Sequence, residues 1–189
     1  MASSSSMNTL SQCERLPDEL LLRVLKHVMV GWDGRKRWCG ALRGVSRRWR
    51  ALHDGACTCL SVRNGVTDEV MHSLSERLPA LTRLYLDGVK SLTAEGLRAV
   101  GGLTALTFLD LEYYSDASDA VLWELRDLTA LTTLFWLHGF PDVTDVSLQH
   151  LASLTALTTL WLVGTTTKAG RKALKATAPP PHTPAVNTR

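Results

Sequence analysis

The sequence has no apolar run long enough to cross a membrane. Its longest apolar stretch, "LLLRVLKHVMV", is interrupted by Arg23 and Lys26, and no run approaches the roughly 20 residues that a membrane-spanning helix needs. The N-terminus lacks the basic start and apolar centre of a secretory signal. Only four cysteines occur among 189 residues, which favours reduced thiols. We therefore expect a protein of the cytoplasm and/or nucleus that does not bind a membrane.

The patterns of an enzyme or a metal site are also missing. Six histidines are scattered along the chain without the spacing of a nucleophile and its base, and there is no glycine-rich phosphate loop. His53, Cys57 and Cys59 lie close together, but Cys-x-Cys with one histidine lacks the paired spacing of a structural zinc site. We expect no enzymatic activity, no catalytic residues, no metal and no cofactor.

Positive charge is concentrated in one region. The net charge is +3, but residues 14–54 hold ten Lys or Arg against five Asp or Glu. Arginine and tryptophan interleave there in "RKRW" and "RRWR", a composition compatible with nucleic-acid binding. Helical periodicity puts Trp49 on the buried side of its helix, where its ring cannot stack on bases. The favoured expectation is that no nucleic acid is bound.

The second half of the sequence repeats. The phrases "LPALTRLYLDG", "LTALTFLDLEY", "LTALTTLFWLHG" and "LTALTTLWLVG" begin at Leu78, Leu103, Leu128 and Leu154, with spacings of 25, 25 and 26 residues. "CLSVRNGVTDEVMHSLSERLP" fits the same template in a degraded form, which makes about five units. A period in the twenties indicates a solenoid. Each unit pairs a predicted strand with a predicted helix, and the helices are preceded by good caps at Thr67, Thr93, Ser118 and Thr144.

This pattern resembles the leucine-rich repeat, in the variety that carries an α-helix on its convex side. The resemblance covers roughly residues 57–177 and implies a short right-handed solenoid with parallel strands on the concave side. The asparagine or cysteine that usually follows the strand is absent. Val89, Tyr114, Phe140 and Thr165 stand there instead, so apolar packing is expected to replace the buried hydrogen-bond ladder of that family.

Residues that alternate with the strand leucines should line the concave face, because successive side chains of a strand point to opposite faces. Aromatic and charged residues at these positions have the composition of binding anchors. Five strands about 4.8 Å apart make a face only about 20 Å across, which suits a short peptide or loop. The predicted substrate-binding residues are Arg83, Tyr85, Asp87, Phe108, Asp110, Glu112, Trp136 and Trp161.

The third repeat contains two aromatic residues, Phe135 and Trp136, where the others have one. Counting forward from Leu134 places Phe135 on the concave face, whereas counting back from Gly139 places Trp136 there. The alignment of "WLHG" with "YLDG" and "WLVG" favours the second count, with Phe135 in a bulge. The sequence thus predicts a row formed by Tyr85, Asp110, Trp136 and Trp161.

The first half has a different periodicity. "LPDELLLRVLKHV" predicts a helix that begins near Pro17, with an apolar arc of about 200°, wider than one core needs. "WCGALRGVSRRWRALHD" predicts an amphipathic helix with a basic back. Together the two segments resemble an F-box, on residues Leu16, Pro17, Glu19, Leu20, Val45, Ser46, Arg47, Trp49, Arg50, Leu52 and Asp54.

An F-box followed by leucine-rich repeats implies a substrate receptor of an SCF-type cullin-RING ubiquitin ligase, which directs a bound protein to proteasomal degradation. The expected partners are the Skp adaptor, the cullin and RING subunits reached through it, and a protein or peptide substrate. A repeat scaffold acting outside a ligase is the alternative. The candidate adaptor-binding residues are Leu16, Pro17, Leu20, Leu21, Val24, Leu25, Val28, Val45, Trp49 and Leu52.

The predicted fold class is therefore α/β, with a small helical F-box at residues 14–55 followed by a leucine-rich-repeat solenoid at residues 56–177. Residues 1–13 are expected to form a disordered tail. Residues 178–189 are expected to form a second one, because three consecutive prolines continue neither a helix nor a strand.

Overall fold

The computed structural model describes residues 17–28, 46–62, 66–86, 89, 91–111, 119–136, 147–162 and 185–187. The chain divides into two compact units, residues 1–57 and residues 58–189, called unit 1 and unit 2 below. Each unit is described by itself. Every helix in the described ranges is too short or too polar to cross a bilayer.

Unit 1 contains helices α2 (Asp18–Val28) and α4 (Arg47–Ala56), which pack against each other. Pro17 stands immediately before α2, and its carbonyl accepts the N–H groups of Leu20 and Leu21. Proline suits this position because a first-turn N–H has no partner within the helix. Arg48 on α4 donates to the Asp18 carboxylate at the start of α2, which joins the two helices.

Helix α4 begins later than the sequence pattern predicts. The periodicity extends the helix back to residue 38, but Ser46 has extended backbone angles (φ −159°, ψ 170°) and its Oγ accepts the N–H of Trp49 at 3.3 Å. Serine is a preferred N-cap because its side chain replaces a missing helical acceptor. The prediction of one continuous helix is therefore wrong at Ser46, and residues 29–45 lie outside the described part of the chain.

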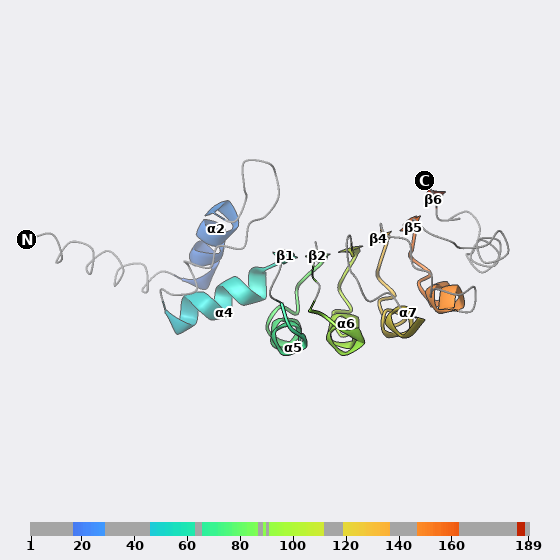
Figure 1. The fold of residues 1–189 in the computed structure, drawn as a ribbon. Helices are drawn as coiled ribbons and strands as arrows, with labels where there is room; N and C mark the ends of the chain where they lie inside the picture. The colour runs from blue at the N-terminus through green and yellow to red at the C-terminus, as the bar shows by residue number, and fades with distance from the viewer. Residues whose placement is uncertain are drawn as a thin grey trace, which may run out of the picture. The chain divides into compact units, whose positions relative to one another are not determined.

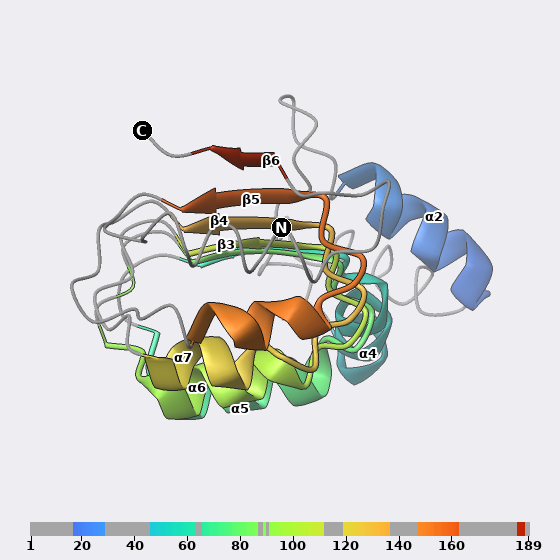
Figure 2. The same ribbon diagram turned by 90° about the vertical axis from the view of Figure 1, so that its right-hand side faces the viewer.

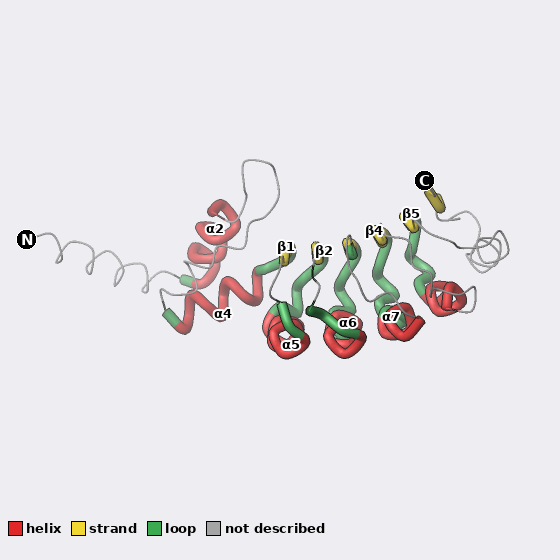
Figure 3. The backbone as a smooth tube through the Cα atoms, in the orientation of Figure 1, coloured by secondary structure: helices red, strands yellow, loops and turns green. Residues whose placement is uncertain are grey.

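Unit 2 is an α/β solenoid with a parallel sheet (Figure 1). Neighbouring strands in the sequence are neighbours in the sheet, and every pair is parallel. This confirms the predicted strand–helix repeat, and Figure 3 shows the alternation of the two along the chain. The strands are β1 (Cys59–Val62), β2 (Arg83–Leu86), β3 (Phe108–Asp110), β4 (Thr133–Trp136), β5 (Thr159–Leu162) and β6 (Ala185–Asn187).

All the described helices of unit 2 lie on one face of the sheet (Figure 2). Parallel strands are about 4.8 Å apart, whereas packed helices need 8–10 Å, so the helical layer is the convex one. The opposite face of the sheet is called the concave face below. The helices are α5 (Asp68–Arg77), α6 (Ala94–Gly101), α7 (Asp119–Glu124) and the 3₁₀ helix η1 (Ser147–Ser153).

Within the segment predicted to be a disordered C-terminal tail, residues 185–187 form strand β6. Residues 185–187 pair with β5 in parallel, with Val186 opposite Leu160 and Asn187 opposite Trp161. The unpaired N–H and C=O groups of an exposed edge strand attract any segment that can adopt an extended conformation. The short "AVN" segment, which begins immediately after Pro184, the last proline of the chain, supplies such an extended strand.

Leucines in register fill the space between the sheet and the helices. Leu60, Leu84, Leu109, Leu134 and Leu160 face one another on successive strands, and none is more than 2% exposed. Val89 is also completely buried, as expected for apolar packing after the strand. Burial of such side chains contributes about 1.5–3 kcal/mol each. The other expected residues at that position, Tyr114, Phe140 and Thr165, lie outside the described residues.

A ladder of threonine hydroxyls runs along the N-terminal ends of the strands. The Oγ1 of Thr82 donates to the Thr58 carbonyl, Thr107 to Thr82, Thr132 to Thr107 and Thr158 to Thr132, at 2.9 to 3.0 Å. Each of these carbonyls also accepts two backbone N–H groups from the next repeat. The recurring threonine of "LTALT" is explained by this ladder, which the sequence analysis did not predict.

The helix caps follow the expected positions where the structure describes them. Thr93 precedes α6, and its Oγ1 accepts the N–H of Glu95 at 3.2 Å. The Asp68 carboxylate at the start of α5 accepts the backbone N–H and the hydroxyl of Thr93, at 2.8 and 2.7 Å. These hydrogen bonds link the first turn of α5 to the N-cap of α6. Thr67 precedes α5. The predicted caps Ser118 and Thr144 lie outside the described residues.

Candidate functional site

Four aromatic rings form a continuous line across the concave face, one on each of strands β2 to β5. We call Tyr85, Phe108, Phe135 and Trp161 the aromatic row. The ring centroids of consecutive members are 4.9, 5.6 and 5.7 Å apart, within the range of favourable aromatic contacts. All four residues are half-buried, so each ring keeps part of its surface exposed.

The row is built by strand register. Tyr85, Asp110, Phe135 and Trp161 are opposite one another on successive strands. Asp110 would interrupt the line of rings, but Phe108 lies two residues earlier on the same face and contacts Tyr85 and Phe135 diagonally. The rings therefore continue past the carboxylate without a break.

Arg83 covers one end of the aromatic row. Its guanidinium carbon lies 5.6 Å from the centroid of the Tyr85 ring and 5.0 Å from that of Phe108, within the range of cation–π attraction. Its Nη2 also donates to the Tyr85 hydroxyl. The arginine is exposed, whereas Asp110, on the next strand, is half-buried. The row thus has a fixed cation at its β2 end and a carboxylate beside its middle.

Five of the eight predicted substrate-binding residues lie together on this face: Arg83, Tyr85, Phe108, Asp110 and Trp161. Asp87 and Glu112 lie outside the described residues. Trp136, the eighth, is not at the position that the sequence analysis gave it.

The predicted register of the aromatic pair is wrong. Phe135 lies opposite Asp110 and Trp161, while Trp136 lies opposite Leu162, in the register of the other face of the sheet. Strand β4 pairs with β5 without interruption from Thr133 to Trp136, so it contains no bulge. The extra residue of the 26-residue spacing therefore falls after the strand.

The threonine ladder explains why the forward count is correct. The hydroxyl and backbone N–H of Thr132 fix the start of β4 against Thr107 before the chain reaches the two rings. Register is then set from the N-terminal end, and side chains alternate from there. The alignment from Gly139 relied on the end of the phrase, which lies outside the described residues.

The predicted adaptor-binding residues divide by exposure. Leu20 is 44% exposed and Pro17 is exposed, whereas Leu21 and Trp49 are buried and Leu52 is half-buried. Leu21 and Trp49 therefore stabilise unit 1 itself. Leu16 and Val45 lie outside the described residues, and so do the side chains of Val24, Leu25 and Val28, whose backbone belongs to α2.

The buried face of α4 contains a polar pair that the periodicity did not single out. His53 is completely buried and its Nδ1 lies 3.0 Å from Oδ1 of Asp54, itself 7% exposed. Cys57 and Cys59 are also buried. Among the residues that the structure describes, no group of three or more His, Cys, Asp or Glu side chains could hold a metal ion.

The convex layer carries an exposed tryptophan that the sequence analysis missed. Trp123 on α7 is 46% exposed, and the guanidinium carbon of Arg126 lies 4.1 Å from its ring centroid. The ring of His150 meets it edge-on at 4.8 Å. Trp123 follows the buried Leu122 in a helix of only six residues, a position that the repeat pattern alone assigns to solvent.

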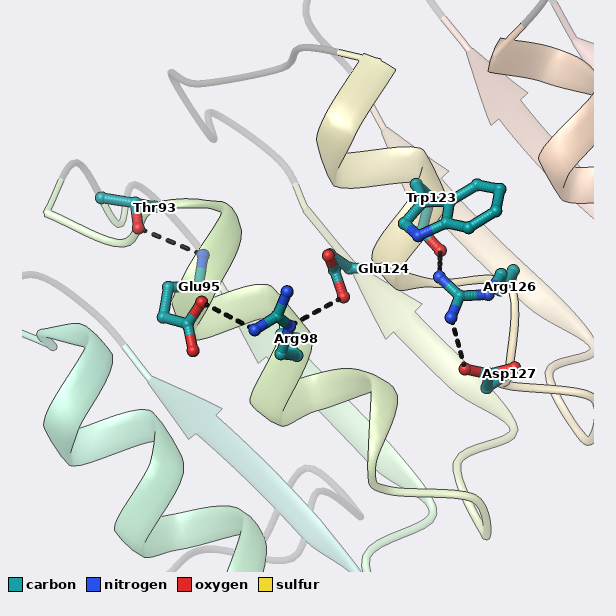
Figure 4. Close-up of polar contacts among 7 residues, drawn as sticks. All are labelled: Thr93, Glu95, Arg98, Trp123, Glu124, Arg126 and Asp127. Atoms are coloured by element: carbon teal, nitrogen blue, oxygen red, sulfur yellow. Dashed lines mark hydrogen bonds and ion pairs between the residues drawn. The ribbon is translucent and has the colours of Figure 1, made fainter.

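Ion pairs on the convex layer join α6 to α7, and a further pair involves Arg126 beside Trp123 (Figure 4). Arg98 on α6 lies 3.3 Å from Glu95 of its own helix and 3.4 Å from Glu124 of α7. Arg126 lies 3.6 Å from Asp127. Exposed pairs of this kind contribute at most about 1 kcal/mol each. Both arginines of this group thus have an acidic partner, with two cations set against three carboxylates.

No protein-family model matches the chain, and no curated protein matches its sequence. Among solved structures, the chain is similar to an internalin from Listeria monocytogenes, with 17% sequence identity and a TM-score of 0.38. The similarity covers 65% of this chain and 46% of the internalin, so the chain spans less than half the length of that structure.

Proposed function

We propose that this chain is a non-catalytic substrate-recognition subunit of an SCF-type ubiquitin ligase. Unit 1 docks on the Skp adaptor, and the aromatic row of unit 2 binds the target. Ubiquitin transfer belongs to other subunits, while this chain contributes proximity and orientation. The observation that carries the binding role is the line of four half-exposed rings across β2 to β5.

The aromatic row has the properties of a protein-binding surface. Tyrosine, tryptophan and arginine dominate the binding energy of interfaces because they bury large areas with few rotatable bonds. Rings in contact with one another are held in place before a partner arrives, which lowers the entropy lost on binding. The row crosses four strands, roughly 15 Å, and this length suits a peptide or loop.

The adaptor role is supported by the sequence of unit 1 and by the exposure of Leu20. Leu20 and Leu21 are neighbours on α2, yet Leu21 is completely buried and Leu20 is 44% exposed. A helix that presents an apolar residue outward beside an exposed proline offers a surface for a hydrophobic groove. Leu20 and Pro17 are therefore the described residues most suited to contact the adaptor.

The test is a binding measurement between the purified full-length chain and purified Skp adaptor. Leu20→Asp should weaken adaptor binding at least about tenfold, because a charge would enter an apolar contact. Val70→Asp is the matched control, since Val70 is 43% exposed on α5 in unit 2. Absence of binding by the unmodified chain would refute the ligase proposal.

A repeat scaffold acting outside a ligase is the second candidate, favoured by the fact that the aromatic row lies entirely within unit 2. This function needs the row but not the outward face of α2. A chain that binds its target normally, fails to bind the adaptor and is unaffected by Leu20→Asp would support the scaffold.

A further inference from the structure

The β1–β2 end of the aromatic row presents three hydrogen-bonding side chains on one face. Ser61 of β1 is exposed and lies opposite Tyr85 of β2, one strand spacing away, about 4.8 Å. Arg83 precedes Tyr85 by two residues and therefore shares its face. Two hydroxyl-bearing side chains and a guanidinium thus occupy neighbouring positions on this face, while the rest of the row is dominated by rings.

Among the described residues, Arg83 is held in place by aromatic rings and a hydroxyl and not by a carboxylate. Its guanidinium contacts the rings of Tyr85 and Phe108 and donates to the Tyr85 hydroxyl. No carboxylate of a described residue forms an ion pair with it. A guanidinium that lies against rings keeps the donors on its edge directed away from them, and it has five N–H donors of which the tyrosine takes one.

The neighbouring hydroxyls can complete a binding site for an oxyanion. The Tyr85 oxygen accepts a hydrogen bond from Arg83, so its own proton is available to donate. Ser61 supplies a second hydroxyl donor. The planar fork of arginine matches the oxygen spacing of a carboxylate or a phosphate, and these charge-assisted hydrogen bonds are about twice as strong as neutral ones.

We propose that Arg83, Tyr85 and Ser61 bind an oxyanion of the target peptide, either an acidic side chain or a phosphorylated one, while the adjoining apolar side chains of the peptide rest on Phe135 and Trp161. The inference depends on the proposed function of the aromatic row. It adds the chemical class of the target and the position of its charge.

A carboxylate borders the site on its β3 side. Asp110 lies opposite Tyr85 on β3, so Ser61 and the rings of β4 and β5 lie on opposite sides of Tyr85. A peptide that crosses the strands therefore has one favoured direction, with its oxyanion at β1–β2 and its apolar part at β4–β5.

The experiment uses random octapeptide libraries in which one central position is fixed as glutamate or as phosphoserine. Binders selected on the full-length chain are resynthesised with glutamine at that position, and their affinities are measured by fluorescence anisotropy. On the unmodified chain the change to glutamine should weaken binding about tenfold, as expected for loss of a charge-assisted hydrogen bond. The two libraries distinguish a carboxylate from a phosphate.

The assignment to Arg83 is tested by repeating each comparison on Arg83→Gln and on Arg98→Gln, an exposed arginine of the convex layer with the same loss of charge. On Arg83→Gln the glutamate or phosphoserine peptide should bind no better than its glutamine counterpart, whereas Arg98→Gln should behave as the unmodified chain does. Equal sensitivity of all three proteins to the peptide charge would overturn the proposal.

The same measurements separate this inference from the proposed function. Binders that are weakened by Phe135→Ala but discriminate against glutamine equally on the Arg83 variant would overturn the oxyanion site and leave the aromatic row as the binding surface. Binders that are unaffected by Phe135→Ala would remove the row itself, and with it both proposals. Adaptor binding by unit 1 does not enter either comparison.

Discussion

On the strand side of unit 2 one hydrogen bond recurs from repeat to repeat, whereas on the helix side each repeat differs from the last. Four threonine hydroxyls donate over 2.9 to 3.0 Å, and the leucines behind them stay in register. The helices shorten from ten residues in α5 to eight in α6 and six in α7, and η1 is a 3₁₀ helix.

The difference shows where the register of the array is determined. A strand must match both of its neighbours at every residue, because a slip of one position turns all of its side chains to the other face. A helix needs only to cover the leucines beneath it. The aromatic row depends on the strand register alone, so the differences in helix length and type between repeats need not disturb it.

The largest expected effect on stability comes from removing a completely buried leucine from the strand layer, compared with removing one from the helix layer. Leu134→Ala on β4 should lower the free energy of unfolding by about 4 kcal/mol, and Leu122→Ala on α7 by about 2–3 kcal/mol. The strand cannot move to fill the cavity because its neighbours fix its register, whereas the helix can. Urea denaturation of both variants measures the two values. Equal losses would mean that the layers are equally rigid.

The next effect concerns a close approach between helices. A Cβ on Gly101 would lie 2.4 Å from the backbone oxygen of Glu124, so Gly101→Ala should push α6 away from α7 and lower stability by about 1–3 kcal/mol. Gly55→Ala is the control, because no atom lies within 4 Å of a Cβ there. It should be neutral or raise stability by up to about 1 kcal/mol, since alanine favours helix. Thermal unfolding of both variants provides the comparison. A neutral Gly101→Ala would show that α6 and α7 can move apart with little loss of stability.

A pair of adjacent threonines tests the ladder on the strand side. Thr132→Val removes the hydroxyl that donates to Thr107 and should cost about 1 kcal/mol. Thr133→Val, one residue later, should be neutral or slightly stabilising, because valine suits a strand and the Thr133 hydroxyl makes no hydrogen bond to a described residue. Denaturant titration distinguishes the two. If both variants had the same stability, the hydroxyl ladder would not contribute to the register.

The periodic parts of the fold could be predicted from the sequence, and the residue that breaks the period could not. Leucine spacing was enough to place the strands, their parallel order and the concave positions of Tyr85 and Trp161. It could not locate the extra residue near Phe135, because that depends on hydrogen bonds at Thr132 which the pattern of apolar residues does not contain. A count from the N-terminal end of the phrase would have given the correct register.

Other features were beyond reach for a different reason. The pairing of β6 depends on an unsatisfied edge of β5, and the contact of Trp123 with His150 depends on how α7 packs against η1. The division between outward Leu20 and buried Leu21 required knowing which side of α2 faces α4. Each of these features follows from the packing of one element against another. The periodicity within a single segment contains no information about that packing.

The smallest expected effect lies at the start of α5 and depends on pH. The hydroxyl of Thr67 and the backbone N–H of Glu69 donate to the Glu69 carboxylate and hold its pKa below the usual value. A carboxylate whose pKa is lower in the folded state stabilises the fold above its unfolded pKa, and this stabilisation is lost as the pH falls through the folded value. Glu69→Gln should therefore be slightly less stable than the unmodified chain at pH 7, and the difference should shrink as the pH is lowered towards 3, as measured by thermal unfolding at both values. Because the carboxylate is fully exposed, salt should reduce the difference. A stability difference that persisted unchanged in acid would assign the effect of Glu69 to helix packing and not to its charge. The helices would then be more sensitive to substitution than their differing lengths from repeat to repeat suggest.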